Sequence, residues 1–268
     1  MDYQVLVIRY LYERFLYRLS ASRYREKFCL KGGALLYAYE KEFPRPTLDI
    51  DLLGIKIKND EAVLKQIFME IITIPSESDG VVFDENSIKV ENIAENKAYH
   101  GFRMKYIAHL DSIIQTMQID IGFGDVIIPA AQSLNYPVLI PNLPVPDILV
   151  YSLETVVAEK FHAMIDLAEL NSRYKDFYDV FKILSQTNLD ENNLKDAILS
   201  TFKNRKTSFK ANHPLFIDDF YENQNRQSMW KAFLRKIKHP DDLDFSIVIK
   251  TIVERLHPFY LELKNNTN

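Results

Sequence analysis

Cysteine is nearly absent from this sequence of 268 residues, which contains only Cys29. A single cysteine excludes an intramolecular disulfide and also excludes a metal site built from several thiolates. Cys29 lies between Phe28 and Leu30, and this apolar setting favours a buried position. Since nothing in the chain requires an oxidising compartment, we expect a cytoplasmic protein.

Long hydrophobic runs are absent as well. The first apolar run, Val5 to Ile8, follows Asp2, and charged residues soon interrupt what comes after it. A transmembrane helix needs about 20 predominantly apolar residues, and a secretory signal has a basic start rather than an acidic one. The pattern therefore predicts neither a signal peptide nor a membrane partner.

The chain also lacks a strong excess of one charge. Its formal net charge of −4 gives no global signature of nucleic-acid binding. The segment from Lys203 to Lys238 differs, because it carries nine Lys or Arg against three acidic residues, a local charge of +6. A basic segment on an otherwise acidic protein suits a polyanionic partner.

The period of the hydrophobic pattern changes along the chain. It is helical over residues 3–20 and 60–72, and becomes two between residues 80 and 125. The second pattern predicts closely spaced antiparallel strands at 81–83, 87–93, 99–108 and 113–121, with residues 84–86 as a turn. After a proline-rich connector over 129–146 the spacing is helical again. We expect an α/β protein with a mixed-sheet domain over 1–147 and an α-helical domain over 148–268.

Glycine is scarce, yet two of the seven glycines stand in tandem at Gly32 and Gly33. Such a pair, at the start of a helix, lets the backbone approach a phosphate closely. Asp49 and Asp51 follow, and a strand over 48–53 would point both carboxylates to one face. Magnesium is held by one or two carboxylates together with substrate phosphates. A turn and a solvated edge are the alternatives, but the combination favours phosphoryl or nucleotidyl transfer.

A third carboxylate, Asp120, repeats the pattern of an acid on an apolar strand. It stands in the segment 118–125, and we expect it to be a further metal ligand. The alternative is an acid that approaches a glycine turn at the end of a strand. Asp125 suits that turn role better than Asp120 does.

Lys160 interrupts the apolar stripe of a helix that Ser152 can cap. A buried ammonium is costly, so Lys160 must either reach solvent or meet an anion, such as a carboxylate or a nucleotide phosphate. In the next predicted helix, 173–185, Asp176 borders the apolar stripe and Asp179 lies further round, toward solvent or an ion pair. Both interpretations of Lys160 remain open at this point.

Cations and aromatic residues alternate in the basic C-terminal segment. Phe209 is surrounded by Lys203, Arg205, Lys206 and Lys210. This arrangement suits RNA, because cations meet phosphates while rings can stack on unpaired bases. A solvated face without a ligand is the alternative.

Two groups of residues resemble the motifs of the AbiEii/MenT family of nucleotidyltransferase-like toxins. The first group is Lys31-Gly32-Gly33 with Arg45-Pro46-Thr47-Leu48-Asp49-Ile50-Asp51-Leu52. The second is Glu159-Lys160 with Arg173-x-Lys175-Asp176-x-x-Asp179. The resemblance covers about residues 28–184. The spacer between Gly33 and Asp49 is longer than the commonest form in the wider nucleotidyltransferase superfamily.

The resemblance implies an enzyme that transfers nucleotides from an NTP to RNA, at the 3′ acceptor end of tRNA, and so blocks translation. It implies Mg²⁺ as cofactor and a cognate, AbiEi-like antitoxin as partner in an abortive-infection system. An enzyme acting on a small-molecule or protein hydroxyl, and a catalytically idle binding module, are the alternatives.

The expected roles fall into three sets. The catalytic residues are Asp49, Asp51, Asp120, Lys160 and Asp176, of which the first three hold the metal. The nucleotide-binding residues are Lys31, Gly32, Gly33, Thr47 and Lys160. The residues expected to contact RNA are Arg173, Lys203, Arg205, Lys206 and Lys210.

Overall fold

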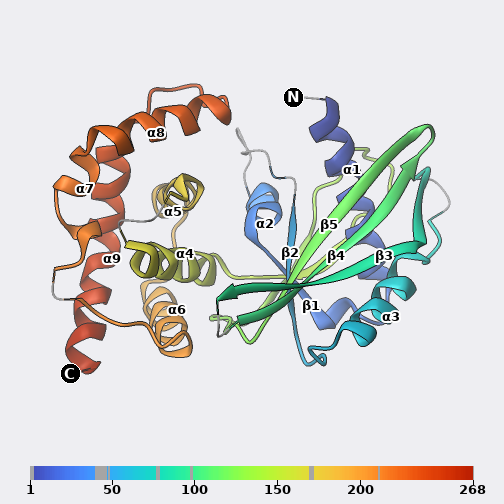
Figure 1. Ribbon diagram of the computed structural model, residues 1–268, viewed down its shortest axis with the longest axis horizontal. Helices are drawn as coiled ribbons and strands as arrows, with labels where there is room; N and C mark the ends of the chain where they lie inside the picture. The colour runs from blue at the N-terminus through green and yellow to red at the C-terminus, as the bar shows by residue number, and fades with distance from the viewer. Residues whose placement is uncertain are drawn as a thin grey trace. The chain divides into compact units, whose positions relative to one another are not determined.

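The computed structural model describes residues 3–39, 47, 49–76, 79–96, 99–168, 172–210 and 212–267. The chain forms two compact units, one of Met1–Asp125 with Ala131–Tyr151 and one of Val126–Ala130 with Ser152–Asn268. The first unit is built on a seven-stranded sheet, and the second is helical (Figure 1). The expected α/β class is confirmed. Arg45, Pro46 and Leu48 of the first motif lie outside the described residues.

The sheet unit mixes parallel and antiparallel pairing. Its strands are β1 (Phe28–Lys31), β2 (Ile50–Gly54), β3 (Val81–Asn96), β4 (Tyr99–Leu110), β5 (Ile113–Phe123), β6 (Gln132–Asn135) and β7 (Asp147–Val150). They are ordered β3-β4-β5-β2-β1-β7-β6. Two pairs are parallel, β2 with β5 and β1 with β7, and the other neighbours are antiparallel. The short strand β2 therefore lies between β1 and the much later strand β5.

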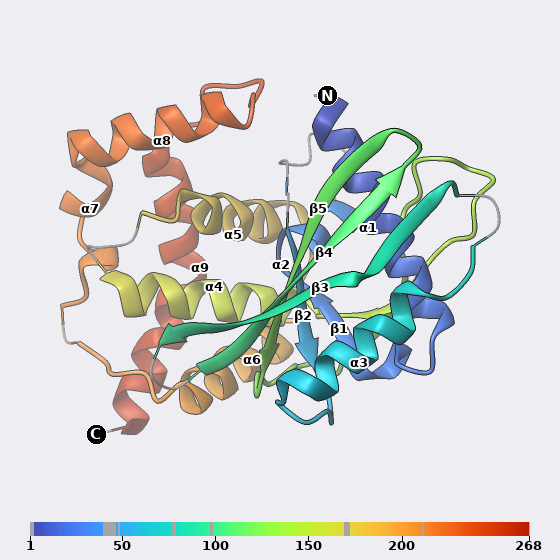
Figure 2. The same cartoon turned by 45° about the vertical axis from the view of Figure 1, so that its right-hand side comes forward.

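The predicted turn at residues 84–86 is wrong. Strand β3 runs through it without a break, and Figure 2 shows β3 and β4 as a long pair. The pairing register with β4 shifts between Asp84 and Lys89, and the Ser87 hydroxyl accepts a hydrogen bond from the Ile107 N–H at 2.8 Å. A bulge accommodates the polar residues, so they disturb the ladder without ending the strand.

One face of the sheet is apolar and carries the core. Its buried side chains on the central strands are Leu30, Ile50, Leu52, Phe102, Met104, Tyr106, Met117, Ile119 and Ile121. Helices α1 (Tyr3–Ala21) and α3 (Glu61–Ile72) contribute to the same core. Phe15 stacks on Phe68 with ring centroids 5.7 Å apart and lies 6.0 Å from Tyr106. Because side chains alternate along a strand, the intervening residues project from the opposite face.

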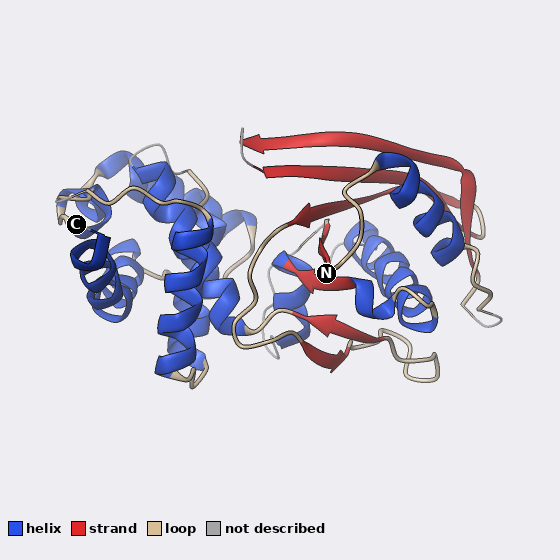
Figure 3. Cartoon of the chain, turned by 90° about the horizontal axis from the view of Figure 1, so that it is seen from below, coloured by secondary structure: helices blue, strands red, loops and turns tan. Residues whose placement is uncertain are grey.

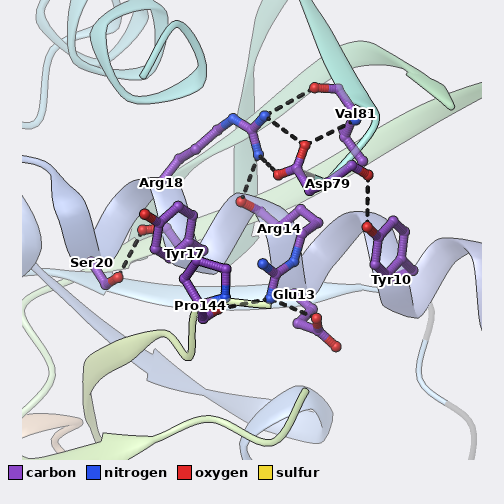
Figure 4. A network of polar contacts seen from close by, with 9 residues as sticks. All are labelled: Tyr10, Glu13, Arg14, Tyr17, Arg18, Ser20, Asp79, Val81 and Pro144. Atoms are coloured by element: carbon purple, nitrogen blue, oxygen red, sulfur yellow. Dashed lines mark hydrogen bonds and ion pairs between the residues drawn. The ribbon is translucent and has the colours of Figure 1, made fainter. Parts of the chain in front are cut away.

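Buried charges tie α1 to the start of β3 (Figure 4). Arg18 Nη1 donates to Asp79 Oδ2 at 2.7 Å, and Arg18 Nη2 donates to the Val81 carbonyl at 2.9 Å. The Tyr10 hydroxyl donates to the Asp79 carbonyl at 2.7 Å. The Arg18 and Asp79 side chains are 4% and 1% exposed. Such a pair is stable only while both partners are present, since either charge alone would be buried without compensation.

The helical unit has an aromatic core. Its helices are α4 (Leu153–Leu167), α5 (Tyr174–Gln186), α6 (Glu191–Asn204), α7 (Asp219–Glu222), α8 (Gln224–Lys236) and α9 (Phe245–Thr267). Trp230 packs on Phe245 with ring centroids 5.2 Å apart, and its indole N–H donates to the Leu243 carbonyl at 2.6 Å. Figure 3 shows the sheet unit as strands together with helices, and the helical unit as helices joined by loops. Within the described ranges, no helix has both the length and the apolar character needed to cross a bilayer.

The start of α4 confirms the predicted cap. The Ser152 hydroxyl accepts from the Thr155 N–H, which satisfies one of the unpaired donors of the first turn. The same hydroxyl donates to the Ile128 carbonyl at 2.8 Å, and the Ile128 N–H donates to the Thr155 hydroxyl at 2.8 Å. These bonds explain why residues 126–130 belong to the helical unit.

Replacing Asp79 by alanine is expected to lower the free energy of unfolding of the sheet unit by about 3–5 kcal/mol, because Arg18 would remain buried without a partner. The exposed Arg23 to Glu70 pair provides the control, since the Arg23 side chain is 72% exposed. Arg23→Gln should cost less than about 1 kcal/mol. Urea unfolding of both variants measures the difference, and equal losses would contradict the structural role of the Arg18 to Asp79 pair.

Candidate functional site

Four charged residues lie at the same level on the strands β4, β5, β2 and β1, and Glu91 on β3 is the register partner of the first of them, Arg103. Arg103 on β4 is directly opposite Asp120 on β5. Asp120 is in turn beside Asp51 on β2, and Asp51 is opposite Lys31 on β1. Residues in register on neighbouring strands project to the same face. We call these four residues, Arg103, Asp120, Asp51 and Lys31, the charged row. Its order of charge is positive, negative, negative, positive.

The structure brings the three predicted metal carboxylates into one region. Asp51 and Asp120 stand on neighbouring strands, which are about 4.8 Å apart. Asp49 is exposed and precedes β2 by one residue. Burial raises the pKa of Tyr12, and the charges of Asp49, Asp120 and Asp51 raise it further. All three carboxylates therefore act on the same phenol.

Gly32 makes room for the Asp51 carboxylate. It is the first residue of helix α2 (Gly32–Tyr39) and has a φ of +67°, in the left-handed region that favours glycine. A Cβ atom at this position would lie 1.9 Å from Asp51 Oδ2. The role of Gly32 and Gly33 toward a phosphate stays a prediction. Thr47, the other predicted nucleotide-binding residue here, donates its hydroxyl to the Asp49 carbonyl at 3.3 Å.

Lys31 reaches an acid beyond the charged row. Its Nζ atom is 2.6 Å from Asp125 Oδ2 and 3.5 Å from the Tyr151 hydroxyl. Tyr151 donates to the same carboxylate oxygen at 3.3 Å, and its buried ring lies under the ammonium at 5.1 Å. Sequence reasoning gave Asp125 only a turn role and did not select Tyr151. The two residues fix the end of the Lys31 side chain.

Arg103 is a further residue of this site that sequence reasoning missed. Its Nε and Nη2 atoms donate to the two oxygens of Asp120 at 2.8 and 2.7 Å. These hydrogen bonds to Asp120 raise the pKa of the Arg103 guanidinium above its ordinary value. The only signal in the sequence is an arginine inside a predicted strand. Without the register between β4 and β5, nothing connects it with Asp120.

A second charged cluster lies within the helical unit. Lys160 Nζ is 2.6 Å from Asp176 Oδ1 and 2.9 Å from Asp179 Oδ2. The Lys160 side chain is 13% exposed, and both carboxylates are buried. Arg173 Nε contacts the second oxygen of Asp176 at 2.9 Å. Lys160 thus meets anions, as one interpretation required, and Asp179 forms the ion pair that was one of its two expected alternatives. Catalytic roles for Lys160 and Asp176 stay predictions.

The residues expected to contact RNA have different surroundings. Lys203, Lys206 and Lys210 are exposed near the end of α6 and in the segment after it. Arg205 instead pairs with Glu159 at 3.3 Å. The half-buried ring of Phe209 stacks on Phe202 with centroids 5.9 Å apart, so it contributes to the core of the unit.

The carboxylates of the sheet unit fit a hard divalent cation. Magnesium needs one or two carboxylate ligands and retains several waters. Asp49 and Asp51 can supply these carboxylates. Where the chain is described, no cluster of three or more His, Cys, Asp or Glu side chains has the geometry to hold a metal ion. The ion pair with Arg103 accounts for the position of the Asp120 carboxylate.

Known proteins share this fold. A family model described as "Nucleotidyl transferase AbiEii toxin, Type IV TA system" matches residues 14–252. The crystal structure of JHP933 from Helicobacter pylori aligns with a TM-score of 0.50 and 14% identity, covering 100% of this chain and 96% of that one. A second structure from H. pylori, whose nucleotidyltransferase assignment is provisional, gives 0.52 and 14%, with 99% and 98% covered. At this identity the likeness shows the fold alone. A search of curated sequences finds no match.

Gly32→Ala is expected to displace Asp51 and weaken binding of Mn²⁺, because the new Cβ atom would occupy the position of the carboxylate. Gly80→Ala is the matched control, since Gly80 has a φ of +65° and its nearest neighbour would be Leu110 Cδ1 at 3.5 Å. Both variants should lose about 1–2 kcal/mol of stability from the left-handed backbone. Calorimetric titration with Mn²⁺ separates them, and equal affinities would show that Gly32 does not serve Asp51.

Proposed function

The chain belongs to the AbiEii family of nucleotidyl transferase toxins of type IV toxin–antitoxin systems, and from this we propose that it is a Mg²⁺-dependent enzyme that transfers nucleotides from an NTP to the 3′ acceptor end of tRNA. Family membership supports nucleotidyl transfer and an antitoxin partner. The observation that carries the proposal is the position of Asp51 beside Asp120 on one face of the sheet, with Asp49 close by.

The sheet unit would hold the nucleotide. Asp49 and Asp51 are the proposed metal ligands, with Asp120 as the third carboxylate. A bound Mg²⁺ would neutralise charge on the phosphates of the NTP and orient them. The N–H groups at the start of α2, after Gly32 and Gly33, suit the phosphates, since the positive end of a helix dipole points toward that position. The protein thus contributes mainly positioning and electrostatic stabilisation.

The family resemblance also implies catalytic roles for the charged cluster of the helical unit. We assign Lys160 to the leaving polyphosphate and Asp176 to the acceptor hydroxyl, either as a base or as a positioning acid. The contacts of Lys160 with two buried carboxylates support a charged ammonium at this position. Arg173 Nε lies 2.9 Å from the second oxygen of Asp176 and adds a second positive charge beside this carboxylate.

RNA is the proposed acceptor because exposed cations extend from the end of α6. Lys203, Lys206 and Lys210 suit phosphate contacts, and Arg173 is half-exposed. The biological setting that follows is a cytoplasmic toxin that blocks translation by modifying tRNA during abortive infection and is restrained by an AbiEi-like antitoxin.

One observation favours a different acceptor. Arg205 and Phe209 are engaged in contacts within the helical unit, which leaves fewer groups for RNA than the sequence suggested. A nucleotidyltransferase that modifies a small-molecule or protein hydroxyl is therefore the second candidate. An idle binding module explains the charged row less well, because such a module has no need for two adjacent carboxylates.

Total RNA incubated with Mg²⁺ and each labelled NTP in turn should acquire label at tRNA, and Asp51→Ala should abolish that label. Asp111→Asn is the control, because Asp111 lies in the exposed turn between β4 and β5 at a φ of 50°, which asparagine tolerates. The control should retain transfer. Label on a protein or a small molecule, with none on RNA, would favour the second candidate.

Lys160→Met should abolish NTP binding if the ammonium contacts phosphate, but this variant also leaves Asp176 and Asp179 buried with one fewer cation. The loss of stability is expected to be about 3–5 kcal/mol. Lys160→Met combined with Asp179→Asn removes one charge of each sign and should recover much of that stability. Persistent loss of NTP affinity in the double variant supports the assignment. Unchanged affinity would restrict Lys160 to a structural role.

A further inference from the structure

We propose that Arg103 is an internal counter-cation that competes with the divalent metal for Asp120. This inference rests on the proposed function, since it concerns the same carboxylates. Without metal, the guanidinium neutralises Asp120; metal binding to the carboxylates displaces it. Arg103 is therefore a positioning residue whose charge sets the affinity of the site for the cation.

The geometry of the ion pair makes Arg103 a strong partner of Asp120. Arg103 and Asp120 are directly opposite on antiparallel strands, so the register of β4 with β5 is enough to bring the two side chains together. Two parallel N–H donors contact both carboxylate oxygens, at 2.8 and 2.7 Å. This bidentate form is the strongest that arginine makes with a carboxylate. A cation that approaches Asp120 must therefore replace these hydrogen bonds.

Electrostatic repulsion between the two acids calls for a cation beside them. Asp51 and Asp120 stand side by side, and two like charges on neighbouring strands repel each other. Arg103 compensates one end of this pair. A divalent cation placed between the carboxylates would compensate them more completely, and it would repel the guanidinium. Only one of the two cations is then needed close to Asp120.

Solvent reaches the Arg103 to Asp120 ion pair. The Arg103 and Asp120 side chains are 34% and 23% exposed, in contrast to the almost fully buried Arg18 to Asp79 pair. When Arg103 is displaced, water can therefore solvate its guanidinium in place of the carboxylate at a small cost in free energy. Buried pairs lack this option because the lost partner leaves an uncompensated charge. The two ion pairs are thus suited to different tasks.

Lys105 provides a matched comparison on the same strand. It stands two residues beyond Arg103, so it projects from the same face of β4. Its Nζ atom lies 2.9 and 2.8 Å from the two oxygens of Glu91 on β3, which is directly opposite Arg103. Removal of Lys105 changes the net charge of the protein by the same amount as removal of Arg103, but it leaves Asp120 paired.

The test is titration of the full-length protein with Mn²⁺ alone, followed by calorimetry and by the electron paramagnetic resonance of free Mn²⁺. Arg103→Gln should bind Mn²⁺ about tenfold more tightly than the wild type, as expected for removal of one positive charge near the ion in a well-solvated site. Lys105→Gln should stay within about twofold, because its distance and solvent screening weaken its effect. Arg103→Lys retains the positive charge but lacks the paired N–H donors of the guanidinium, and its Mn²⁺ affinity should stay close to that of the wild type.

Equal or weaker binding of Mn²⁺ by Arg103→Gln would overturn the inference, and so would an equal gain in Lys105→Gln. If Arg103→Gln does not fold, Arg103→Met, which keeps much of the side-chain length without the charge, takes its place, and tighter binding of Mn²⁺ supports the inference while equal or weaker binding overturns it. A failure of the proposed function would give a different result. In that case the Asp51→Asn variant would bind Mn²⁺ with the affinity of the wild type, which would show that the metal does not bind at these carboxylates.

Discussion

The parallel pairing of β2 with β5 places Asp51 beside Asp120, and the surrounding structure compensates for the two adjacent negative charges. Arg103 and Lys31 stand at the two ends of the charged row, on the strands that flank the acids. Gly32 leaves the space that the Asp51 carboxylate occupies. The opposite face of the same strands is apolar and packs on α1 and α3, so the strands that carry the acids are also anchored in the core. The positions of the carboxylates are therefore as rigid as the sheet.

Much of this arrangement follows from local sequence. The capped helices at Asp60 and Ser152, the α/β class and the acids on apolar strands all depend on residues close together in the chain. Strand register, in contrast, depends on residues far apart in the chain. Asp120 is 69 positions after Asp51 and Arg103 is 17 positions before Asp120, and only the pairing of β2, β5 and β4 brings them to one level. That is why the carboxylates could be predicted individually, while the arginine that holds one of them was missed.

Side-chain polarity misled the prediction within β3. The polar residues Asp84, Glu85 and Asn86 indicated a turn, but a bulge lets them remain in the strand. For Asp179 the helical wheel left solvent and an ion pair as alternatives, and the buried contact with Lys160 decides for the ion pair. In both cases the outcome depends on tertiary structure rather than on local propensity.

The ion pairs differ in burial, and their burial determines whether the two partners can separate. Arg18 and Asp79 are almost completely removed from water, so their separation would leave two unsolvated charges, and they serve stability alone. Lys160 is 13% exposed, but its two acids are buried, so its charge is required even when no ligand is present. Arg103 and Asp120 are the more exposed pair, and water can replace either partner. A site that must admit a cation needs an acid whose existing partner can leave, and Asp120 meets that condition while Asp79 does not. The exposure of an ion pair, more than its length, therefore indicates which carboxylate is available for chemistry.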